Sequence, residues 1–519
     1  MTQKYPDGKK VIAPGTVIVS AGGEVSDIKK VVSPVLKDVK ASRLYHIDFS
    51  FDELQLGGSA FAQSQGKVGS DVPTVKNAEY FRDAFIAVQQ LVNEGLILAG
   101  HDISAGGLIT TLLEMCFANT KGGLALDLDK IKGDDIVKVL FAENPGIVIQ
   151  VADADAPRAK KILEDAGIAY AKIGVPSADR NITIKRHQSN AQVPNSELAN
   201  RELTLVFDID EMRDAWYKTS YLLDRRQSFN GKAAERFKNY KNVPLECTFK
   251  APQLKAVPRP EGNRPVAAII REKGTNSERE MAYSFYLAGF DVKDVTMTDL
   301  ITGRETLEEV NLVAFCGGFS NSDVLGSAKG WAGAFLFNPK AKEALDKFYA
   351  RKDTLSLGVC NGCQLMVELG LLNNDHAVSN AKDYAEMLHN DSHKFESTYV
   401  TLTIPQNDSV MLSSLSGQKI GCWVAHGEGK FNLPLAESEY NIAAKFNHSE
   451  YPANPNGSSY DVAAIASNDG RHLAIMPHPE RTLFPWQCGY YPEERRLTDE
   501  VTPWYEAFVN ARLWIEKNK

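Results

Sequence analysis

The chain has 519 residues, of which 43% are hydrophobic and 24% charged, as in globular proteins large enough to form two or three cores. A net charge of −8 without a long basic run argues against nucleic acid or an anionic membrane as a partner. No apolar stretch approaches the roughly 20 residues that span a bilayer, and MTQKYPDGKK lacks a signal-peptide core. Seven scattered cysteines without metal-ligand spacing favour a reducing, cytoplasmic location.

The first part of the chain mixes strand and helix patterns. GTVIVSA (15–21) and RLYHIDF (43–49) are predicted strands, and residues 28–36 have helical spacing that Pro34 should end or kink. An apolar stripe from Phe81 to Val92 predicts a helix capped by Gly95. Further predicted elements are the strand 96–100, a helix from Leu108 to Cys116, and the strands 146–153 and 182–186.

A region of different composition, residues 205–260, precedes a second α/β pattern. It contains a predicted helix (216–227) and ends in the proline-rich stretch APQLKAVPRPEGNRP, which indicates a linker. Ser277 and Glu280 then have the spacing of a capping box. Apolar runs at 266–270, 311–316 and 354–360, with a helix at 340–350, predict a parallel, doubly wound sheet. Such sheets carry their sites at the C-terminal ends of the strands.

The stretch TLSLGVCNGCQL (354–365) is the most informative part of the sequence. A strand runs into Gly358-Val359-Cys360-Asn361-Gly362 and then into an apolar helix, which is the cysteine form of the nucleophile elbow. A helix N-terminus favours a thiolate. A buried structural cysteine at a strand end is the alternative. Cys363 lies one helical turn farther on and is expected to face the helix packing.

Two segments supply groups that a cysteine nucleophile needs. In MPHPER (476–481) the base His478 and the carboxylate Glu480 are two residues apart, so both point to one side of an extended segment. His426, in AHGEGKF with Glu428, is a rival base. In CGGFSNSD (316–323) a backbone N–H near Gly318, together with that of Asn361, is predicted to form an oxyanion hole, although a plain glycine turn is the alternative.

These residues resemble the class I glutamine amidotransferases, and six ordered motifs narrow the resemblance. GTNSERE, CGGFSNSDVLG, GVCNGCQ, HGEGKF, YPANPNGS and MPHPER resemble the glutaminase domain of the phosphoribosylformylglycinamidine synthase family. The resemblance implies a flavodoxin-like fold over residues 261–519. It assigns the nucleophile to Cys360, the catalytic histidine to His478, the carboxylate to Glu480 and a substrate contact to Gln364.

A second resemblance covers residues 41–204, through LGGSAFAQ (56–63) and HDISAGGL (101–108). These residues resemble the aminoimidazole-ribonucleotide-synthetase-like C-terminal α/β domain of the same family, with 1–40 as the tail of the preceding subdomain and 205–260 as a linker. The resemblance implies that Asp102 binds Mg²⁺ and Ser104 contacts ATP. Capping of the helix that begins near Gly106 is the alternative role for both. Ala105 replaces an acidic residue that some relatives carry.

The implied function is glutamine-dependent amidation in purine biosynthesis. Glutamine would be hydrolysed, and its ammonia would serve ATP-dependent conversion of formylglycinamide ribonucleotide to formylglycinamidine ribonucleotide by a ligase. The family enzyme is longer, so the chain is expected to be a C-terminal piece that lacks most of the synthetase. Two alternatives are a catalytically idle fragment with a structural nucleotide-binding half and the glutaminase of another synthetase.

Overall fold

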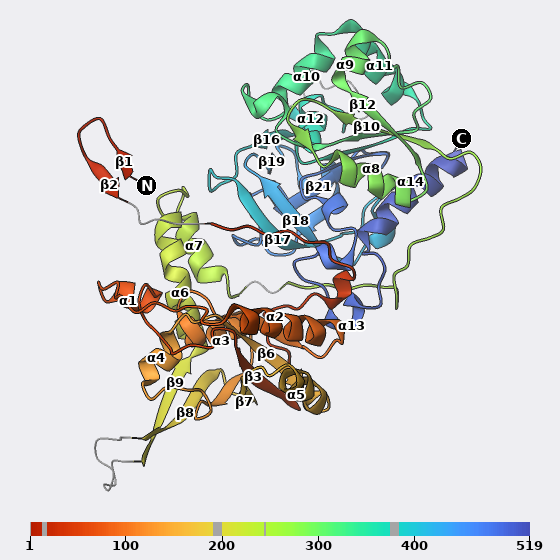
Figure 1. The fold of residues 1–519 in the computed structure, drawn as a ribbon. Helices are drawn as coiled ribbons and strands as arrows, with labels where there is room; N and C mark the ends of the chain where they lie inside the picture. The colour runs from red at the N-terminus through yellow and green to blue at the C-terminus, as the bar shows by residue number, and fades with distance from the viewer. Residues whose placement is uncertain (1, 13–17, 190–199, 243–244, 374–382, 519) are drawn as a thin grey trace. The chain divides into compact units, whose positions relative to one another are not determined.

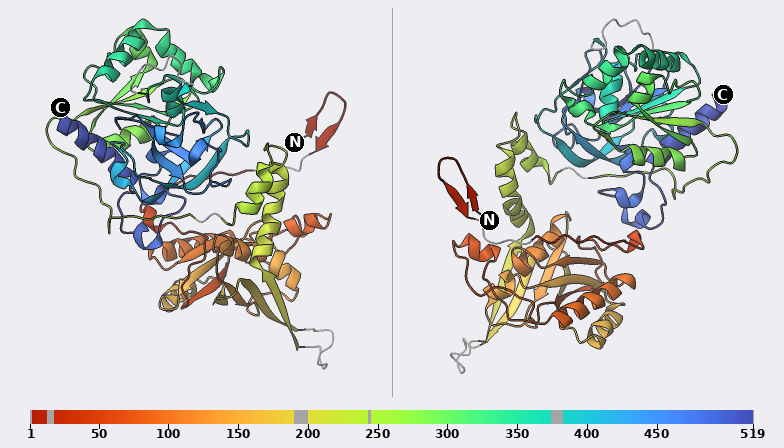
Figure 2. Two further views of the ribbon diagram at one scale, coloured as in Figure 1. Left: turned by 180° about the vertical axis from the view of Figure 1, so that it is seen from behind. Right: turned by 45° about the horizontal axis from the view of Figure 1, so that its top comes forward.

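Two sheets, one in each of two units of the chain, organise the fold (Figures 1 and 2). The computed structural model describes residues 2–12, 18–189, 200–242, 245–373 and 383–518. Unit 1 comprises residues 1–214 and unit 2 comprises residues 215–519. The division falls within helix α6 (Ile209–Asp224), which starts in the first unit and ends in the second.

Unit 1 is built on a seven-stranded sheet with the order β4-β6-β3-β7-β5-β8-β9. All neighbouring strands are antiparallel except β5 and β8. The strands are β3 (Ser42–Asp48), β4 (Ala99–Asp102), β5 (Gly123–Asp127), β6 (Gly146–Ala152), β7 (Tyr170–Ser177), β8 (Asn181–Ser189) and β9 (Asn200–Asp208). A separate hairpin precedes them, formed by β1 (Thr2–Lys4) and β2 (Lys10–Ile12).

Helices cover both faces of this sheet, because alternate residues of its strands are apolar on each side. Tyr45 and Ile47 pack with buried residues of α2 (Ala78–Asn93) and α5 (Ala156–Asp165). Leu44 packs on the other face with α3 (Gly107–Phe117) and α4 (Ile136–Phe141). The short helix α1 (Ala60–Ser64) has no buried residue. The strand predicted at 43–49 is therefore confirmed, and both of its faces are buried.

The predictions for unit 1 fail mainly near its N-terminus. Of the strand 15–21, residues 15–17 lie outside the described part, and 18–21 form no strand. Ile18 and Val19 are 87% and 84% exposed, so no partner buries these apolar side chains. The helix predicted over 28–36 is only a 3₁₀ turn at Ile28–Lys30, because Pro34 prevents helical continuation. The strand predicted at 96–100 begins later, at Ala99.

Unit 2 contains a nine-stranded sheet. Five of its strands confirm the predicted parallel arrangement, and four more strands extend the sheet. Strands β12-β10-β13-β15-β22 are parallel neighbours, and β21-β20-β17-β18 continue the sheet with antiparallel pairing. In this order the strands are β12 (Asp291–Thr296), β10 (Val266–Arg271), β13 (Leu312–Phe315), β15 (Leu355–Val359), β22 (His472–Ile475), β21 (Val462–Ala466), β20 (Asn441–Phe446), β17 (Glu396–Thr403) and β18 (Lys419–His426).

Helices flank the parallel part of this sheet on opposite sides of β10 and β12 (Figure 1). One group is α8 (Glu278–Leu287) with α14 (Trp504–Asn518), and the other is α9 (Met297–Thr302), α10 (Lys329–Leu336), α11 (Pro339–Ala350) and α12 (Asn361–Glu368). The remaining elements are α7 (Lys232–Asn239), α13 (Glu493–Arg496) and two strand pairs, β11 (Thr275–Asn276) with β14 (Gly317–Gly318) and β16 (Glu386–Leu388) with β19 (Lys430–Asn432).

The capping box predicted at the start of α8 is wrong. Ser277 precedes the helix with a positive φ of 67° and makes no side-chain cap bond. Its hydroxyl oxygen accepts a hydrogen bond from Arg481 Nε at 2.8 Å. The serine therefore connects α8 to the segment after β22 and does not cap the helix. The helix ends at Leu287, and Gly289 follows at φ 100°, a left-handed conformation that suits glycine after a helix.

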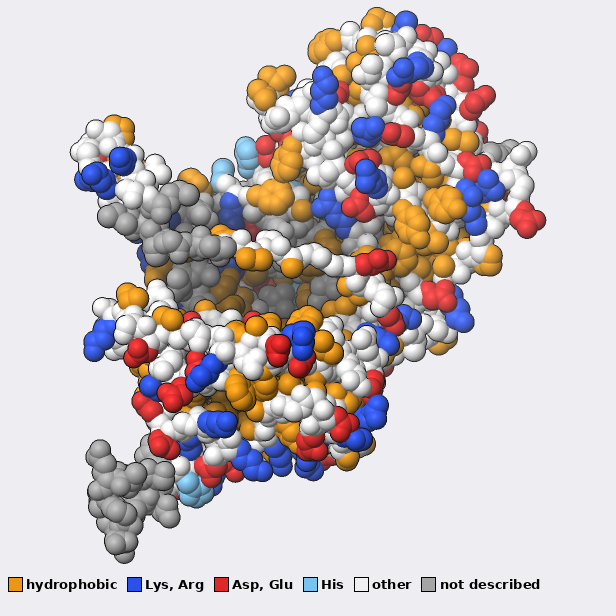
Figure 3. Space-filling model, in the orientation of Figure 1, with side chains coloured by type: hydrophobic (Ala, Val, Ile, Leu, Met, Phe, Trp, Pro, Cys, Tyr) orange, Lys and Arg blue, Asp and Glu red, His pale blue; other side chains and the backbone are white. Residues whose placement is uncertain are grey.

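The surface carries mixed charge on the face shown in Figure 3, where acidic and basic side chains are interspersed over the described residues. No helix of the described residues has both the length and the apolarity that a membrane crossing requires. Helices α2 and α6 have 16 residues each, and both have exposed polar positions.

Helix α12 packs so closely on the sheet that two positions accept only glycine. A Cβ on Gly362 would lie 2.1 Å from the carbonyl oxygen of Phe315 in β13. A Cβ on Gly358 in β15 would lie 2.5 Å from the carbonyl oxygen of Gly362. These backbone atoms cannot move independently of their strands, so the close approach of helix to sheet requires both glycines.

We expect Gly362→Ala to destabilise unit 2 by about 1–3 kcal/mol, because the new methyl group overlaps a backbone carbonyl. Gly333→Ala in α10 is the matched control. Its Cβ would meet Phe337 at an ordinary 3.7 Å, so helix propensity should make this change neutral or stabilising by up to about 1 kcal/mol. All six tryptophans lie beyond residue 215, so urea unfolding followed by tryptophan fluorescence reports on unit 2. Equal stability of the two variants would contradict the packing argument.

Candidate active site

Cys360 occupies the turn between β15 and α12, as the elbow motif predicts. Its backbone is held at φ 52° and ψ −107°, a conformation that costs energy for any residue other than glycine. The Cys360 N–H donates to Ile475 O at 2.9 Å, and the N–H of Gln364 donates to Cys360 O at 3.0 Å. The side chain is only 4% exposed, and its sulfur lies 3.5 Å from Ala425 O. Sheet and helix thus fix the thiol at the C-terminal end of β15.

His478 and Glu480 form a buried pair just beyond the neighbouring strand, β22. His478 Nδ1 lies 2.7 Å from Glu480 Oε1, and each residue is 1% exposed. The backbone of His478 is fixed at both ends, because its N–H donates to Trp423 O and its carbonyl accepts from Thr482 Oγ1. A carboxylate on Nδ1 leaves Nε2 as the ring atom available for proton transfer.

Cys360 and His478 both lie next to Gly317. A Cβ on this glycine would lie 3.0 Å from His478 Cε1 and 3.3 Å from Cys360 Cβ. Both side chains therefore touch the same small volume above the end of β13. Within the described residues His478 Nε2 has no hydrogen-bond partner, although the nitrogen is buried. An orphaned ring nitrogen beside a thiol is what a proton-transfer site leaves free for its reactants.

The charge of His478 is set by two opposing effects. Burial lowers the pKa of this imidazole, but the carboxylate of Glu480 and the sulfur of Cys360 raise it more, to about 9. The ring is therefore protonated at neutral pH in this arrangement. An imidazolium beside a sulfur favours the thiolate, which is the nucleophilic form.

His426, the rival base, lies in a different environment. It is 2% exposed, its Nε2 lies 3.1 Å from Asn456 Nδ2, and a Cβ on Gly429 would lie only 2.0 Å from its ring. Burial, reinforced by the nearby charge of His478, lowers the pKa of His426 to about 3. No carboxylate hydrogen-bonds to this ring in the described part of the chain. His426 is thus held neutral and packed, whereas His478 has a carboxylate partner.

The predicted oxyanion residues flank the thiol. Gly318 has φ 118°, and a Cβ there would lie 2.6 Å from Gly274 O. Asn361 is fully buried, and its side-chain oxygen accepts from Ser320 N at 3.0 Å. This bond ties the turn after β14 to the start of α12, so the Gly318 and Asn361 backbones are held near the same sulfur.

Cys363 faces the packing of α12, as predicted. It is fully buried, and burial holds the pKa of its thiol well above the ordinary value. Burial also raises the pKa of Cys422, which lies 3.6 Å from Thr482 Oγ1. Both thiols stay protonated at neutral pH and are poor nucleophiles.

Gln364 lies in a polar network that the sequence did not reveal. Its side-chain oxygen accepts from Asn361 Nδ2 at 2.9 Å, and its side-chain nitrogen donates to Glu428 O at 2.7 Å. Asn361 Nδ2 also lies 3.4 Å from a carboxylate oxygen of Asp323. Asp323 belongs to the motif CGGFSNSD and Glu428 to HGEGKF. The sequence therefore contained both motifs but did not indicate that these two residues lie close together.

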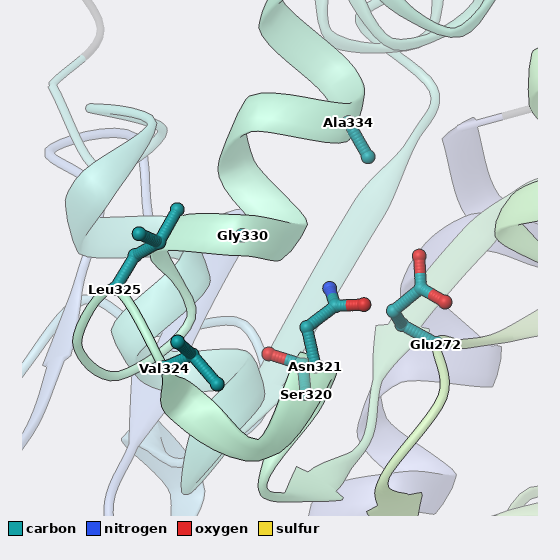
Figure 4. A pocket seen from close by; sticks show the side chains of 7 residues that line it. All are labelled: Glu272, Ser320, Asn321, Val324, Leu325, Gly330 and Ala334. Atoms are coloured by element: carbon teal, nitrogen blue, oxygen red, sulfur yellow. The ribbon is translucent and has the colours of Figure 1, made fainter.

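A hollow of about 390 Å³ borders the turn that follows Gly318 (Figure 4). Its lining includes the polar side chains of Asn321 and Glu272 and the apolar side chains of Val324 and Leu325 (Figure 4). Neither Cys360 nor His478 lines this hollow. It adjoins the turn that carries Gly318 and is separate from the thiol.

Asp102 and Ser104 lie at the end of β4 in unit 1. The Asp102 side chain is 76% exposed, and one of its oxygens lies 3.2 Å from His101 Nδ1. The described residues contain no cluster of three or more metal-ligating side chains. An exposed single carboxylate fits Mg²⁺ that keeps its waters and bridges phosphates, and it does not fit a metal enclosed by protein ligands.

Neither Asp102 nor Ser104 caps helix α3. The N-cap of α3 is Gly106, with φ 92° and no side-chain cap bond. The N–H of Gly106 donates instead to Glu143 Oε1 at 2.8 Å, and that same oxygen accepts from Ala60 N at 2.8 Å. Sequence reasoning missed Glu143, which brings the two glycine-rich motifs of unit 1 together.

Comparisons with known proteins assign a family to each region. Residues 264–515 match the CobB/CobQ-like glutamine amidotransferase domain, and residues 47–187 match the AIR synthase related protein, C-terminal domain. The phosphoribosylformylglycinamidine synthase of Homo sapiens is 38% identical over 533 residues, which cover 97% of this chain and 39% of the human protein.

A plant protein and a bacterial structure give two further comparisons. An Arabidopsis thaliana protein named probable phosphoribosylformylglycinamidine synthase, chloroplastic/mitochondrial, is 36% identical over 539 residues, covering 99% of this chain and 37% of that protein. A solved structure titled PurLQS from Thermotoga maritima has a TM-score of 0.37 and 22% identity, covering 49% of this chain and 99% of its own.

The curated relatives are matched along nearly all of this chain, and the chain spans only 37% to 39% of the human and plant proteins. The chain therefore carries an AIR synthase related domain followed by a glutamine amidotransferase domain, and along nearly all of its length it is similar to part of the phosphoribosylformylglycinamidine synthases.

Proposed function

We propose that residues 261–519 hydrolyse glutamine to glutamate and ammonia through Cys360, His478 and Glu480. One observation carries the proposal: a buried thiol and a carboxylate-paired imidazole contact the same point at Gly317. The match of residues 264–515 to a glutamine amidotransferase domain also supports glutamine hydrolysis. Within the described residues His478 Nε2 has no hydrogen-bond partner, and the sulfur of Cys360 has only its weak contact with Ala425 O.

The first half of the reaction forms a thioester. The Cys360 thiolate attacks the side-chain amide carbon of glutamine, and the resulting oxyanion is bound by backbone N–H groups near Gly318 and Asn361. The His478 imidazolium, whose pKa of about 9 keeps it protonated at neutral pH, gives its proton to the departing nitrogen. The C–N bond breaks and ammonia leaves, while Gln364 contacts the bound substrate.

The second half of the reaction returns the enzyme to its starting state. Neutral His478 takes a proton from water, and the hydroxide attacks the thioester carbon. The C–S bond breaks, glutamate leaves, and the thiolate and imidazolium are restored. Glu480 holds the ring so that Nδ1 keeps its proton throughout and Nε2 does the exchange.

The ammonia would be used by a synthetase, of which unit 1 is one part. The relatives' names support ATP-dependent conversion of formylglycinamide ribonucleotide to formylglycinamidine ribonucleotide, a ligase reaction in which ammonia replaces the formamide oxygen. Asp102 would hold Mg²⁺ carried by the nucleotide, and Ser104 would contact its phosphates. Bound ATP would supply the activation that makes the formamide oxygen a leaving group.

Two other functions remain as alternatives. A glutaminase of a different synthetase is disfavoured by the AIR synthase related match over 47–187, which such a protein would not need. An idle fragment would have the same geometry but no glutamine turnover. Measuring glutaminase turnover of this chain alone separates the idle fragment from the proposal, and we expect turnover that is low but above background.

We expect an electrophilic analogue of glutamine, with a chloromethyl ketone in place of the amide, to label Cys360. The thiolate displaces chloride and forms a C–S bond, which peptide mass spectrometry locates. Cys363→Ala should keep the labelling, because that thiol is buried and protonated. Cys360→Ala should lose both the labelling and glutamine turnover. Labelling at Cys363 or Cys422 with Cys360 untouched would overturn the assignment.

Replacing Glu480 by glutamine should change the pH dependence of Cys360 alkylation. The carboxylate raises the pKa of His478 against the effect of burial, so its loss lowers that pKa. In the unchanged chain the imidazolium persists until about pH 9, so the alkylation rate with iodoacetamide should be nearly constant over roughly pH 6.5–8.5. In Glu480→Gln the rate should rise by up to roughly tenfold per pH unit, as for an ordinary thiol.

Glu368→Gln, at the end of α12, is the control for this experiment. Its carboxylate is not among the groups that shift the pKa of His478, so the flat profile should persist. A flat profile in Glu480→Gln as well, or a steep one in the unchanged chain, would show that Glu480 does not set the charge of the site.

A further inference from the structure

One buried asparagine holds the bend between β18 and β19. Asn390 is 0% exposed and lies in none of the six sequence motifs. Its N–H donates to Gly427 O at 2.9 Å, and its side-chain nitrogen donates to His426 O at 2.8 Å. Its side-chain oxygen accepts from Gly429 N at 3.0 Å. A single residue thus supplies three of the hydrogen bonds that fix this bend.

A second asparagine holds the same bend from another segment. Asn456 is 0% exposed, its Nδ2 donates to Gly429 O at 2.8 Å, and the same nitrogen lies 3.1 Å from His426 Nε2. The Asn456 side-chain oxygen accepts from Ser458 N at 3.0 Å, which fixes the orientation of the amide. Because a buried polar group that loses its partner is costly, the bend has little freedom to move.

The loop that carries Asn390 is itself anchored by two ion pairs. Lys394 Nζ lies 2.6 Å from Asp224 Oδ1, and Arg236 Nη2 lies 2.6 Å from Glu396 Oε2. The two carboxylate side chains are only 11% and 4% exposed, so solvent ions screen these pairs less than they would screen pairs on the surface. Asn390 therefore acts on the bend from a fixed position.

The held segment contacts both the nucleophile and the start of α12. Ala425 O, one residue before the bend's anchor in β18, lies 3.5 Å from Cys360 Sγ. Glu428 O accepts from Gln364 Nε2 at 2.7 Å, and the side-chain oxygen of Gln364 accepts from Asn361 Nδ2 at 2.9 Å. Asn361 follows the cysteine directly and carries one of the proposed oxyanion donors. The position of the bend thus bears on the thiol and on the oxyanion donor together.

We propose that Asn390 is a positioning residue for glutamine hydrolysis, which holds the bend so that Gln364 and the backbone of Asn361 stay aligned with the thiol. A displacement of about 1 Å at reacting groups can cost on the order of 100-fold in rate, so a clamp that acts through two contacts is sufficient to affect the reaction. The inference rests on the proposed glutaminase function and adds a residue that aligns its reacting groups.

Alignment and thiolate formation are separable in this arrangement. The charge that favours the thiolate is that of His478, and Asn390 is not among the groups that shift the pKa of this imidazole. Loss of Asn390 should therefore disturb the alignment of substrate with Cys360 and leave the nucleophilicity of the sulfur unchanged. A residue that only stabilised the fold would not separate these two properties.

The test compares two electrophiles on the full chain. The chloromethyl ketone analogue of glutamine must be aligned with Cys360, whereas iodoacetamide needs only the thiolate. We expect Asn390→Ala to lower the labelling rate with the glutamine analogue by at least about tenfold. The rate with iodoacetamide should stay within about twofold, with the same flat pH profile. Asn456→Ala should show the same selective loss, because it frees the bend from the other side.

Asn407→Ala is the matched control. Asn407 is 5% exposed and also fixes a bend of unit 2, since its side-chain nitrogen donates to Pro405 O at 2.8 Å and its side-chain oxygen accepts from Ser409 N at 3.0 Å. It follows β17 at the end of that strand away from the thiol site. This variant should keep both labelling rates. Urea unfolding followed by tryptophan fluorescence shows which variants are folded, and Asn456→Ala alone decides if Asn390→Ala is not.

Two results would overturn the positioning role. An unchanged rate with the glutamine analogue in Asn390→Ala would show that the clamp does not align the reacting groups. An equal fall with both electrophiles would assign Asn390 a structural role only. A different result would overturn the proposed glutaminase, and this inference with it: labelling of Cys360 in the unchanged chain by iodoacetamide but not by the glutamine analogue.

Discussion

The contact between α12 and the parallel strands determines the geometry of the whole site. Gly362 lies against the backbone of β13 and Gly358 lies against Gly362, so the helix cannot shift along the sheet without a backbone clash. That constraint holds Cys360 at φ 52° in the turn between them. The strain is tolerated because β15 has strand partners on both sides, β13 and β22. The same partners supply Gly317 and His478 from their C-terminal ends.

Strand order therefore explains why segments far apart in the sequence become one site. The loops after β13, β15 and β22 leave the sheet at one edge, because these strands are parallel neighbours. The antiparallel strand β18 adds the segment from Ala425 to Glu428, which contacts the sulfur and Gln364. This segment reaches the site only because four strands with antiparallel pairing extend the sheet beyond β22. A purely parallel sheet would lack the Glu428 side of the site.

Sequence reasoning predicted the parts that depend on local pattern and on chain order. The elbow at Cys360 and the His478–Glu480 spacing are local, and alternation of strand and helix is enough to place them at one edge of a sheet. The capping box at Ser277 failed because its hydroxyl bonds to Arg481, some 200 residues away. Residues 18–21 of the predicted strand form none, because no partner surface buries Ile18 or Val19. The predicted helix at 28–36 is only a 3₁₀ turn, because Pro34 prevents helical continuation.

The proximity of Asp323 and Glu428 was beyond sequence reasoning for a related reason. Asp323 belongs to the motif CGGFSNSD and Glu428 to HGEGKF, and each has an ordinary local role as a turn residue or a solvated loop glutamate. Only the fold brings them to consecutive backbone N–H groups at Ser327 and Ala328. Charge density is a property of that spatial arrangement, and no spacing rule within one segment predicts it.

Two buried histidines, His426 and His478, differ in charge because their hydrogen-bond partners differ. Burial acts against protonation in both His426 and His478, so burial alone would leave both neutral. Glu480, at 2.7 Å, reverses the effect for His478, and the resulting charge lowers the pKa of His426 further. A single carboxylate thus fixes opposite charge states in neighbouring rings. The carboxylate, more than the position of either imidazole, distinguishes the two rings and supports the proton-transfer role proposed for His478.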